Sequence, residues 1–297
     1  MAKNLVTIVT GNSNSGSSCI DELFKNYSDK VNVRGVFRSE DKAKPFREKY
    51  TNLEIVTGVD ASEPNSLIPA FKGAQSALIV TTHDPSKGFA DDALLTANLI
   101  NSAVENGVSY IVLVGSWTVH SDKLTILASR FKPSEELLAK LEKEKGIKWT
   151  VLRGGFFMDN LIHMFKVSEA SEIRLPDFLF PMVDTRDIGK SGAVCLAADN
   201  QERHHGKYYE MSGPEQLTGE NIAKIFSNVL NRDVKFNPLS MDEVRTYLPP
   251  YIVQVIFLLL FLIRKYLFSL LFIFYYNKRY MNLCRRLVKM RFHLIKM

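Results

Sequence analysis

Short apolar runs alternate with amphipathic segments over the first half of the chain. The runs are rich in β-branched residues and apolar on both faces, which is typical of buried strands in a parallel sheet. They occupy residues 5–9, 31–37, 53–57, 77–81, 110–114 and 149–153. Helical spacing between them predicts helices around 20–24, after 39, within 63–72, and over 90–105 and 133–144. This alternation predicts a doubly wound parallel α/β sheet with right-handed crossovers.

The regular alternation stops after residue 153. The elements that follow are less evenly spaced and are separated by loops that contain Gly or Pro. The pattern predicts helices over 157–165, 187–198, 220–230 and 240–247 and a strand over 207–211. We therefore expect a core over residues 1–153 and a smaller α/β lobe over 154–250. The lobe is expected to be intertwined with the core and to close over the carboxyl edge of its sheet.

The net charge is unevenly distributed along the chain. The formal charge of +6 arises from residues 251–297, which hold nine Lys or Arg and no Asp or Glu. Residues 1–250 carry 29 basic and 32 acidic side chains, so their net charge is −3. A slightly acidic body gives no electrostatic reason to expect nucleic-acid binding.

The three cysteines, Cys19, Cys195 and Cys284, are far apart and form no Cys-x-x-Cys pair. This spacing argues against a disulfide framework and against a zinc site. The pair His204-His205 has no third ligand at helical or hairpin spacing, so we expect no metal. Free thiols, and a first strand with no apolar signal region before it, predict a cytoplasmic protein, with a nuclear location as the alternative.

Candidate chemistry begins in the loop between the first expected strand and the first expected helix. The candidate phosphate-binding residues of this loop are Gly11, Asn12, Ser13, Asn14, Ser15 and Gly16. Glycines at this place let the backbone approach a pyrophosphate, which rests on the helix N-terminus. The spacing is Gly-x-x-x-x-Gly and not the usual fingerprint. The position of the loop, more than its spacing, therefore predicts a dinucleotide-binding Rossmann core.

The end of the second strand indicates which dinucleotide is bound. NAD sites usually place Asp or Glu here to hold the ribose 2′-OH, whereas an Arg accommodates the 2′-phosphate of NADP. This chain has Arg38, with Lys42 one helical turn further on. We therefore predict NADP(H) in preference to NAD. The alternative is that both side chains are solvated surface charges.

Further candidate contacts follow the third and fourth strands. The carboxylate of Asp60, after the third strand, is placed either to accept from the adenine amino group or to stabilise a turn. Thr81 and Thr82 end the fourth strand at the carboxyl edge, where open α/β sheets bind ligands. Lys87, in the loop beyond, is placed to neutralise a phosphate.

Five segments together resemble the sequence of one family. They lie at residues 10–18, 38–42 and 58–60, at 152–160 (Leu-Arg-Gly-Gly-Phe-Phe-Met-Asp-Asn) and at 183–189 (Val-Asp-Thr-Arg-Asp-Ile-Gly). Over about residues 3–250 the chain resembles the NmrA-like branch of the short-chain dehydrogenase/reductase superfamily. The resemblance implies an NAD(P)-binding Rossmann domain with a small C-terminal lobe, and Arg38 at the 2′-phosphate. It also implies a substrate cleft bordered by Phe156, Phe157 and Asn160.

The chain departs from this family's pattern at three places. Asn14 or Ser15 stands where the family has its middle glycine, and a Cβ there would crowd the pyrophosphate. None of the eleven tyrosines has a lysine four residues on, so the Tyr-x-x-x-Lys pair of short-chain dehydrogenases is missing. Ser134 aligns with a lysine of reductase-like members. The candidates that remain for acid/base catalysis are Ser116, Lys132 and His120, each with a purely structural role as the alternative.

Residues 251–297 differ from the rest of the chain. They contain no Gly, Ala, Pro, Thr, Asp or Glu, and 35 of the 47 are Phe, Ile, Lys, Asn, Tyr, Met or Leu, as random translation of AT-rich DNA would give. We favour a tail that derives from intron read-through, a frameshift or an alternative exon. The alternatives are a soluble helix pair and membrane association. Residues 251–276 are long enough to cross a bilayer, but Arg264-Lys265 interrupts them.

These residues leave two functions open. The first is an NADP(H)-binding NmrA-like protein that acts as a redox sensor and regulator of a protein partner, or as a weak reductase. The second is an NADPH-dependent oxidoreductase of quinones or small carbonyl compounds. The missing Tyr-x-x-x-Lys pair favours the sensor, and the segment that contains Phe157 and Asn160 favours the reductase. A homodimer is compatible with either.

Overall fold

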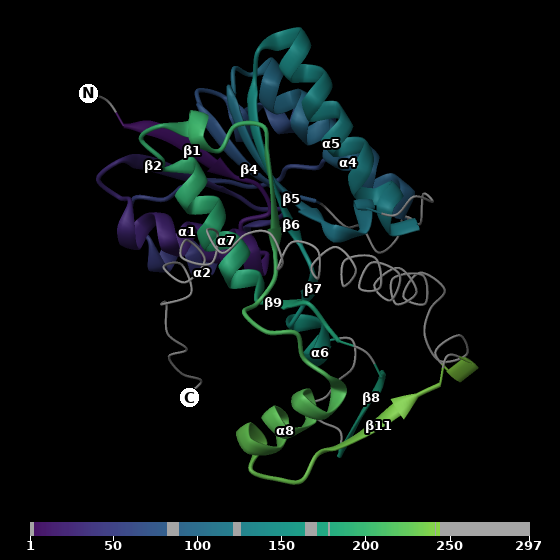
Figure 1. Ribbon diagram of the computed structural model, residues 1–297. Helices are drawn as coiled ribbons and strands as arrows, with labels where there is room; N and C mark the ends of the chain where they lie inside the picture. Colours follow the sequence, from purple (N-terminus) through teal and green to yellow (C-terminus); the bar gives the residue numbers. More distant parts are fainter. Residues whose placement is uncertain are drawn as a thin grey trace.

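The computed structural model describes residues 3–81, 89–120, 126–163, 171–177, 179–240 and 242–243. Its main feature is a sheet of seven parallel strands in the order β10-β6-β5-β4-β1-β2-β3 (Figure 1). The strands are β1 (Asn4–Ile8), β2 (Val31–Val36), β3 (Glu54–Val56), β4 (Ser76–Val80), β5 (Tyr110–Ser116), β6 (Lys148–Gly154) and β10 (Lys207–Met211). The chain runs outward from β1 to β3 and then returns to β4 on the other side of β1. The predicted doubly wound α/β fold is therefore confirmed.

Helices cover both faces of this sheet (Figure 1). One face carries α1 (Asn14–Asn26), α2 (Glu40–Lys49) and α7 (Thr185–Leu196). The other carries η1 (Pro64–Leu67), α3 (Ile68–Phe71), α4 (Phe89–Glu105) and α5 (Ile126–Lys145). Successive strand residues point to opposite faces, so β5 buries Tyr110, Val112 and Val114 on one side and Ile111 and Leu113 on the other. The two-sided apolar runs of the sequence therefore correspond to strands buried on both faces.

Helix α5 begins earlier than the sequence predicts. The pattern places its start at Pro133, because proline inside a helix removes a hydrogen bond and clashes with the preceding turn. In the structure Pro133 lies within α5. The turn before it packs on α4, with Ala128 fully buried and Arg130 Nε 2.8 Å from Oδ2 of the buried Asp92. This packing offsets the cost of the proline.

A smaller lobe with its own apolar core lies below the sheet in Figure 1. Its elements are β7 (Phe156–Phe157), α6 (Asp159–His163), β8 (Glu172–Pro176), β9 (Met182–Val183), α8 (Gly219–Leu230) and β11 (Lys235–Leu239). Strand β7 pairs with β9, and β8 pairs with β11. The predicted helix start at residue 157 is wrong, because Phe156 N and Met158 N donate to carbonyls of Pro181 and Val183 as strand residues do. The hydrophobic pattern contains no sign of β8 and β11.

Residues 185–211, which the sequence assigns to the smaller lobe, return to the large sheet. Helix α7 packs along α1, and β10 extends the sheet beside β6. The chain then leaves the sheet again for α8 and β11, so the two parts are connected by several crossings. The short 3₁₀ segments η2 (Trp117–His120) and η3 (Gln201–Arg203) lie in connections of the large unit.

The start of the predicted helix at 240–247 is present as a capping box. Ser240 N donates to Glu243 Oε2 at 2.9 Å, and Glu243 N donates to Ser240 Oγ at 3.3 Å. The expected end near Tyr247 and the whole of residues 251–297 lie outside the described residues.

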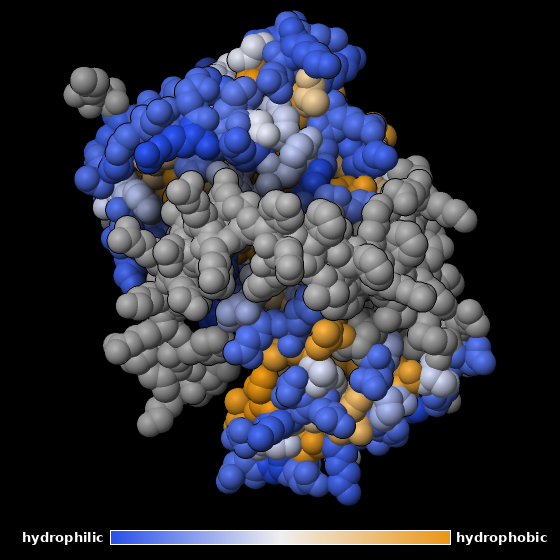
Figure 2. Space-filling view, in the orientation of Figure 1, coloured by the Kyte–Doolittle hydropathy of each residue, from blue (hydrophilic) through white to orange (hydrophobic). Residues whose placement is uncertain are grey.

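Hydrophilic side chains dominate the surface of the large unit, whereas apolar side chains gather on the lower lobe (Figure 2). On α8, Ile225 and Val229 are 46% and 54% exposed, one helical turn apart. Within the ranges that the structure describes, no helix has both the length and the apolar character needed to cross a bilayer.

Candidate functional site at the carboxyl edge of the sheet

The loop from β1 to α1 folds tightly onto the start of the helix. Thr10 has a φ of +58°, in the left-handed region, and Ser13 caps α1 by accepting a hydrogen bond from Gly16 N at 3.0 Å. A Cβ on Gly16 would lie 2.4 Å from the Thr10 carbonyl oxygen, so only glycine fits. This close approach of loop to helix is what a phosphate-binding turn requires. The residues present therefore fit a pyrophosphate at the helix start.

The remaining loop residues have different surroundings. Gly11 lies against the end of β2, since a Cβ there would stand 2.9 Å from Phe37 Cζ. Asn12 and Asn14 are exposed, whereas Ser15 is buried. Of the two candidates for the position of the family's middle glycine, Ser15 thus belongs to the core and Asn14 faces the surface.

The predicted contacts of the adenosine half lie on the neighbouring strand ends. Arg38 lies two residues beyond the end of β2, and Lys42 lies in the first turn of α2; both are exposed. Asp60 Oδ1 accepts from Ser62 N at 2.8 Å and from Ser62 Oγ at 2.7 Å. The Asp60 carboxylate therefore stabilises a turn, as the alternative interpretation proposed, and its contact with adenine stays a prediction.

The end of β4 is only partly described. Thr81 is buried, and its hydroxyl donates to the Val114 carbonyl of β5 at 3.2 Å. This bond turns the hydroxyl toward the sheet. Thr82 and Lys87 lie outside the described residues.

Ser116 ends β5 at the same edge of the sheet. Its Oγ accepts from Thr118 N at 3.3 Å and from Thr118 Oγ1 at 3.2 Å. Because the oxygen already accepts two hydrogen bonds, the hydroxyl proton of Ser116 can be donated to a further acceptor.

A charged cluster that sequence reasoning missed lies at the carboxyl ends of β6 and β10, on the face of the sheet that α5 covers. Arg153, at the end of β6, forms two hydrogen bonds to the buried Glu135 of α5, at 3.1 and 2.7 Å. Its Nη1 also lies 3.0 Å from Glu210 Oε1 of β10, and the same oxygen is 2.8 Å from His120 Nε2. The guanidinium stacks on the ring of Tyr208, 3.9 Å from its centroid. Arg153 in a mostly apolar strand, together with His120 nearby in sequence to Ser116, was the sequence signal for this cluster.

The cluster shifts the acidity of its members. Burial tends to raise the pKa of Glu210, but the hydrogen bonds from His120 and Arg153 outweigh it, so the pKa lies below its usual value. Burial alone would lower the pKa of Arg153, and its hydrogen bonds to Glu135 and Glu210 raise it. The ion pairs therefore keep Glu210 ionised and Arg153 charged beside His120.

The candidate Lys132 and the aligned position Ser134 occupy different environments in α5. Ser134 is fully buried well inside the helix, and within the described residues its hydroxyl has no hydrogen-bond partner. Lys132 is half-buried. Ser134 thus stands in the helix interior and not at a helix start, where the alignment with the family lysine would place it.

The family follows from comparison with known proteins. The family model described as "NmrA-like family" matches residues 2–270. The chain belongs to the NmrA-like family. The expected resemblance is therefore confirmed.

Individual relatives of this NmrA-like chain include enzymes and a regulator. An NAD(P)H azoreductase of Xenophilus azovorans is 24% identical over 244 residues, which cover 81% of this chain and 79% of that protein. The structure of Citrobacter sp. triphenylmethane reductase complexed with NADP(H) has a TM-score of 0.68 at 19% identity and covers 85% of this chain and 86% of that one. The structure of NmrA, a negative transcriptional regulator, in complex with NAD has a TM-score of 0.64 at 17% identity, with coverage of 80% and 75%. The likeness to the two solved structures shows the shared fold.

The two most characteristic motifs of the NmrA-like chain meet beside the glycine loop. In the segment 183–189, Asp184 caps α7 by accepting from Arg186 N at 2.8 Å, and the Arg186 carbonyl accepts from Ser18 Oγ of α1 at 2.8 Å. In the segment 152–160, Asp159 contacts both the loop and α7, through Asn14 Nδ2 at 2.8 Å and Thr185 Oγ1 at 2.6 Å.

The three predicted cleft residues lie close to this junction but differ in burial. Phe156 is buried and packs edge-on against Phe180, with ring centroids 5.3 Å apart. Phe157 and Asn160 are half-buried. Phe156 therefore supports the lobe core, Phe157 packs against the core of the large unit, and the place of Phe157 and Asn160 at a substrate cleft stays a prediction.

The adjacent histidines of this chain have separate partners. His204 Nδ1 lies 2.9 Å from the Tyr209 hydroxyl, whereas His205 Nε2 lies 3.4 Å from Glu142 Oε1. Burial and nearby Arg203 lower the pKa of His204. Among the described residues, no group of three His, Cys, Asp or Glu side chains is arranged to hold a metal ion.

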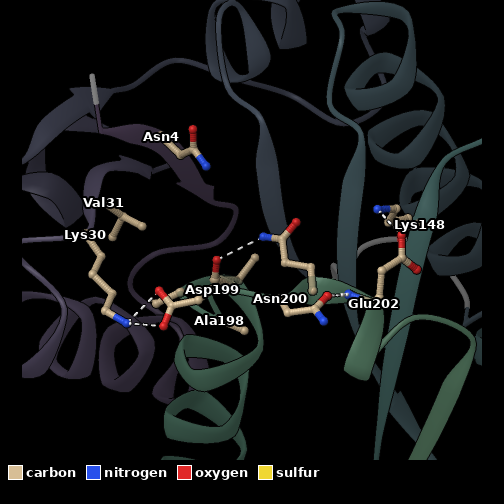
Figure 3. A pocket seen from close by; sticks show the side chains of 11 residues that line it. Asn4, Lys30, Val31, Lys148, Ala198, Asp199, Asn200 and Glu202 are labelled. Carbon is tan, nitrogen blue, oxygen red and sulfur yellow. Dashed lines mark hydrogen bonds and ion pairs between the residues drawn. The ribbon is translucent and has the colours of Figure 1, made fainter. Parts of the chain in front are cut away.

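A hollow of about 440 Å³ lies at the opposite, amino edge of the sheet, where Figure 3 shows its lining side chains. Its charged residues neutralise one another, because Lys30 pairs with Asp199 at 2.8 Å and Lys148 pairs with Glu202. Asn4 at the start of β1 and Val31 at the start of β2 mark this edge. The hollow is therefore distant from the glycine loop, which lies at the carboxyl ends of the strands.

Proposed function

We propose that this chain binds a nicotinamide dinucleotide across the carboxyl ends of its strands and uses it to reduce a small quinone or carbonyl compound. The observation that carries the proposal is the β1–α1 loop, where Gly16 allows the Thr10 carbonyl to approach the helix start. Gly16 N donates to Ser13 Oγ and Ser17 N to the Ser13 carbonyl, so the N–H groups of Asn14 and Ser15 are the ones proposed to bind the anion, which the helix dipole favours.

The proposed dinucleotide is NADP(H) in preference to NAD. Arg38 follows β2 at the place where an acidic residue would hold the ribose 2′-OH, and it is exposed and available for a phosphate. Within the described residues no ion pair neutralises it. Lys42, in the first turn of α2, adds a second positive charge nearby.

The chain's own residues supply the proton for the proposed reduction. The bound dinucleotide supplies a hydride to the substrate. Ser116, at the end of β5, offers its hydroxyl proton to the substrate oxygen that gains charge, and solvent restores the proton. Similarity to an azoreductase and to a triphenylmethane reductase supports a reductive activity on a conjugated small molecule.

A second candidate function is a dinucleotide-sensing regulator without turnover. Two observations favour it. Ser134 of α5, which stands where reductase-like members have a lysine, is buried, and no tyrosine of the chain precedes a lysine by four residues. Similarity to NmrA, a negative transcriptional regulator, supports it. Both functions share the nucleotide site, and we propose a cytoplasmic location for either.

The test separates binding from turnover. NADPH and NADH are titrated into the full-length chain by calorimetry, and NADPH consumption is then followed with a panel of quinones, aldehydes and azo compounds. Tight NADPH binding with turnover supports the reductase, and binding without turnover supports the regulator. If neither nucleotide binds at millimolar concentration, both functions are excluded.

A further inference from the structure

The loop residue Asn14 is held by a carboxylate from a distant part of the chain. Asn14 is the first residue of α1, next to the cap Ser13, and it is one of the two candidates for the position of the family's middle glycine, beside the proposed pyrophosphate. Its Nδ2 donates to Asp159 Oδ1 at 2.8 Å, across 145 residues of sequence. An amide-to-carboxylate hydrogen bond is stronger than one between neutral groups, so it fixes the direction of the Asn14 side chain.

Asp159 is itself fixed from its other oxygen. Oδ2 accepts from the Thr185 hydroxyl at 2.6 Å, and Thr185 is 5% exposed as the first residue of α7. Asp184, the preceding residue, caps α7 and so sets the position of Thr185. The Asp159 carboxylate therefore bridges the first turn of α1 and the first turn of α7, with one oxygen committed to each.

This bridge addresses the steric problem that the missing glycine creates. A side chain at the first position of α1 either covers the N–H groups of the first turn or is directed away from them. An untethered asparagine amide can itself hydrogen-bond to nearby backbone groups, as Asn often does at helix starts. The hydrogen bond to Asp159 engages the amide nitrogen, so it no longer bonds to those backbone groups.

We propose that Asp159, oriented by Thr185, is a positioning residue that holds the Asn14 amide so that the loop can accept a dinucleotide phosphate. The pair Asn14–Asp159 takes the place of the family's middle glycine. This inference rests on the proposed dinucleotide binding. It goes further in assigning Asp159 a role that depends on the identity of residue 14.

A double-mutant cycle on NADPH affinity tests the dependence. Asp159→Ala in the wild-type background should weaken NADPH binding about tenfold, because the Asn14 amide is released. Asn14→Gly should bind NADPH at least as tightly as wild type. Asp159→Ala added to Asn14→Gly should then change the affinity less than twofold. A merely structural role of Asp159 would weaken binding equally in both backgrounds.

Three further variants keep the test independent of folding. Thr185→Val removes the hydroxyl that orients Asp159 and should weaken binding several-fold, whereas Thr185→Ser retains it and should match wild type. Asp187→Ala removes a carboxylate from the same turn of α7, one that pairs with Lys190 at 3.4 Å, and should leave the affinity unchanged. Melting temperatures of all variants, measured without nucleotide, identify any that fail to fold.

Several outcomes would overturn the inference. Tighter NADPH binding by Asp159→Ala would show that the carboxylate repels the phosphate. Equal losses in the wild-type and Asn14→Gly backgrounds would show that Asp159 acts without Asn14. If wild type and Asn14→Gly bind no nucleotide at all, the proposed function fails and the inference fails with it. Binding by Asn14→Gly alone would show instead that the site is competent and that the Asn14–Asp159 pair does not replace the glycine.

Discussion

Gly189 of α7 lies against the backbone of Ser15 in α1. A Cβ on Gly189 would stand 2.2 Å from the Ser15 carbonyl oxygen and 2.9 Å from Cys19 N. Backbone atoms cannot rotate away as a side chain can, so the two helices are in contact at a point that tolerates only glycine. Because Ser15 belongs to the first turn of α1, this contact links helix packing to the geometry of the phosphate loop.

We expect Gly189→Ala to lower the free energy of unfolding by about 1–3 kcal/mol, as overpacking does. It should also weaken NADPH binding, since α1 must move at its first turn. Gly192→Ala is the matched control. Its Cβ would meet rotatable leucine side chains, Leu78 Cδ1 at 3.0 Å and Leu152 Cδ1 at 3.8 Å, and alanine is the better helix former. Urea unfolding of both variants checks the difference, and equal stability would contradict the contact.

Glu210 should contribute a pH-dependent part of the stability. Its pKa is lowered in the folded chain by His120 and Arg153, against the opposing effect of burial. Because the pKa is lower in the folded chain, Glu210 stabilises the protein at pH values above its unfolded-state pKa of about 4.3. This stabilisation is lost as the pH falls through the folded-state pKa. Since 40% of the Glu210 side chain is exposed, we expect about 1 kcal/mol at pH 7.

The measurement is the free energy of unfolding of Glu210→Gln between pH 3 and 7. The difference from wild type should be largest above pH 5 and should shrink toward pH 3. Glu144→Gln, which removes an exposed carboxylate 3.9 Å from Lys140, serves as the control and should show little difference at any pH. A difference for Glu210→Gln that does not vary with pH would argue against the ion pair.

The sheet could be predicted from the sequence because its strands are apolar on both faces and separated by helices. That pattern is local, and it located six strands of the large unit to within two residues or so at their ends; β10 was also located as a strand, but its place in the large sheet was missed. The lobe strands Glu172–Pro176 and Lys235–Leu239 are short, contain charged residues and proline, and pair only with each other. Their stability comes from a partner far along the chain, so no local pattern reveals them.

The candidate site likewise has some features that a local sequence pattern reveals and others that it does not. The glycine loop and Arg38 could be found because each sits at a fixed place after a strand. The bond between Asn14 and Asp159 could not, since it depends on how the lobe meets the sheet. The Glu135–Arg153–Glu210 cluster likewise joins α5, β6 and β10, whose neighbours become known only with the strand order.

The buried ion pair between Asp92 of α4 and Arg130 of α5 should be important for stability. Asp92 Oδ2 lies 2.8 Å from Arg130 Nε, with the Asp92 side chain fully buried and that of Arg130 18% exposed. Burial lowers the pKa of Arg130, and the Asp92 charge opposes that effect. Removing one partner leaves a buried charge uncompensated, so we expect Asp92→Ala to cost about 3–5 kcal/mol. Replacing both residues with apolar side chains of similar size should recover most of the loss in thermal unfolding, whereas additive losses would contradict the pairing.

Arg38→Ala should remove the preference for NADP. A charge-assisted hydrogen bond to a phosphate contributes about 1.5–3 kcal/mol, so NADPH affinity should fall roughly 10- to 100-fold. NADH lacks the 2′-phosphate, and its affinity should change less than threefold. Lys44 is an exposed cation of α2 that does not lie at the strand end, so Lys44→Ala removes the same charge and should affect the affinity for both nucleotides only slightly.

Arg38→Asp should go further and favour NADH, because an acidic residue at this position accepts from the ribose 2′-OH. Calorimetric titration of each variant with both nucleotides gives the ratio directly. An unchanged ratio in Arg38→Ala would show that this arginine is a solvated surface charge.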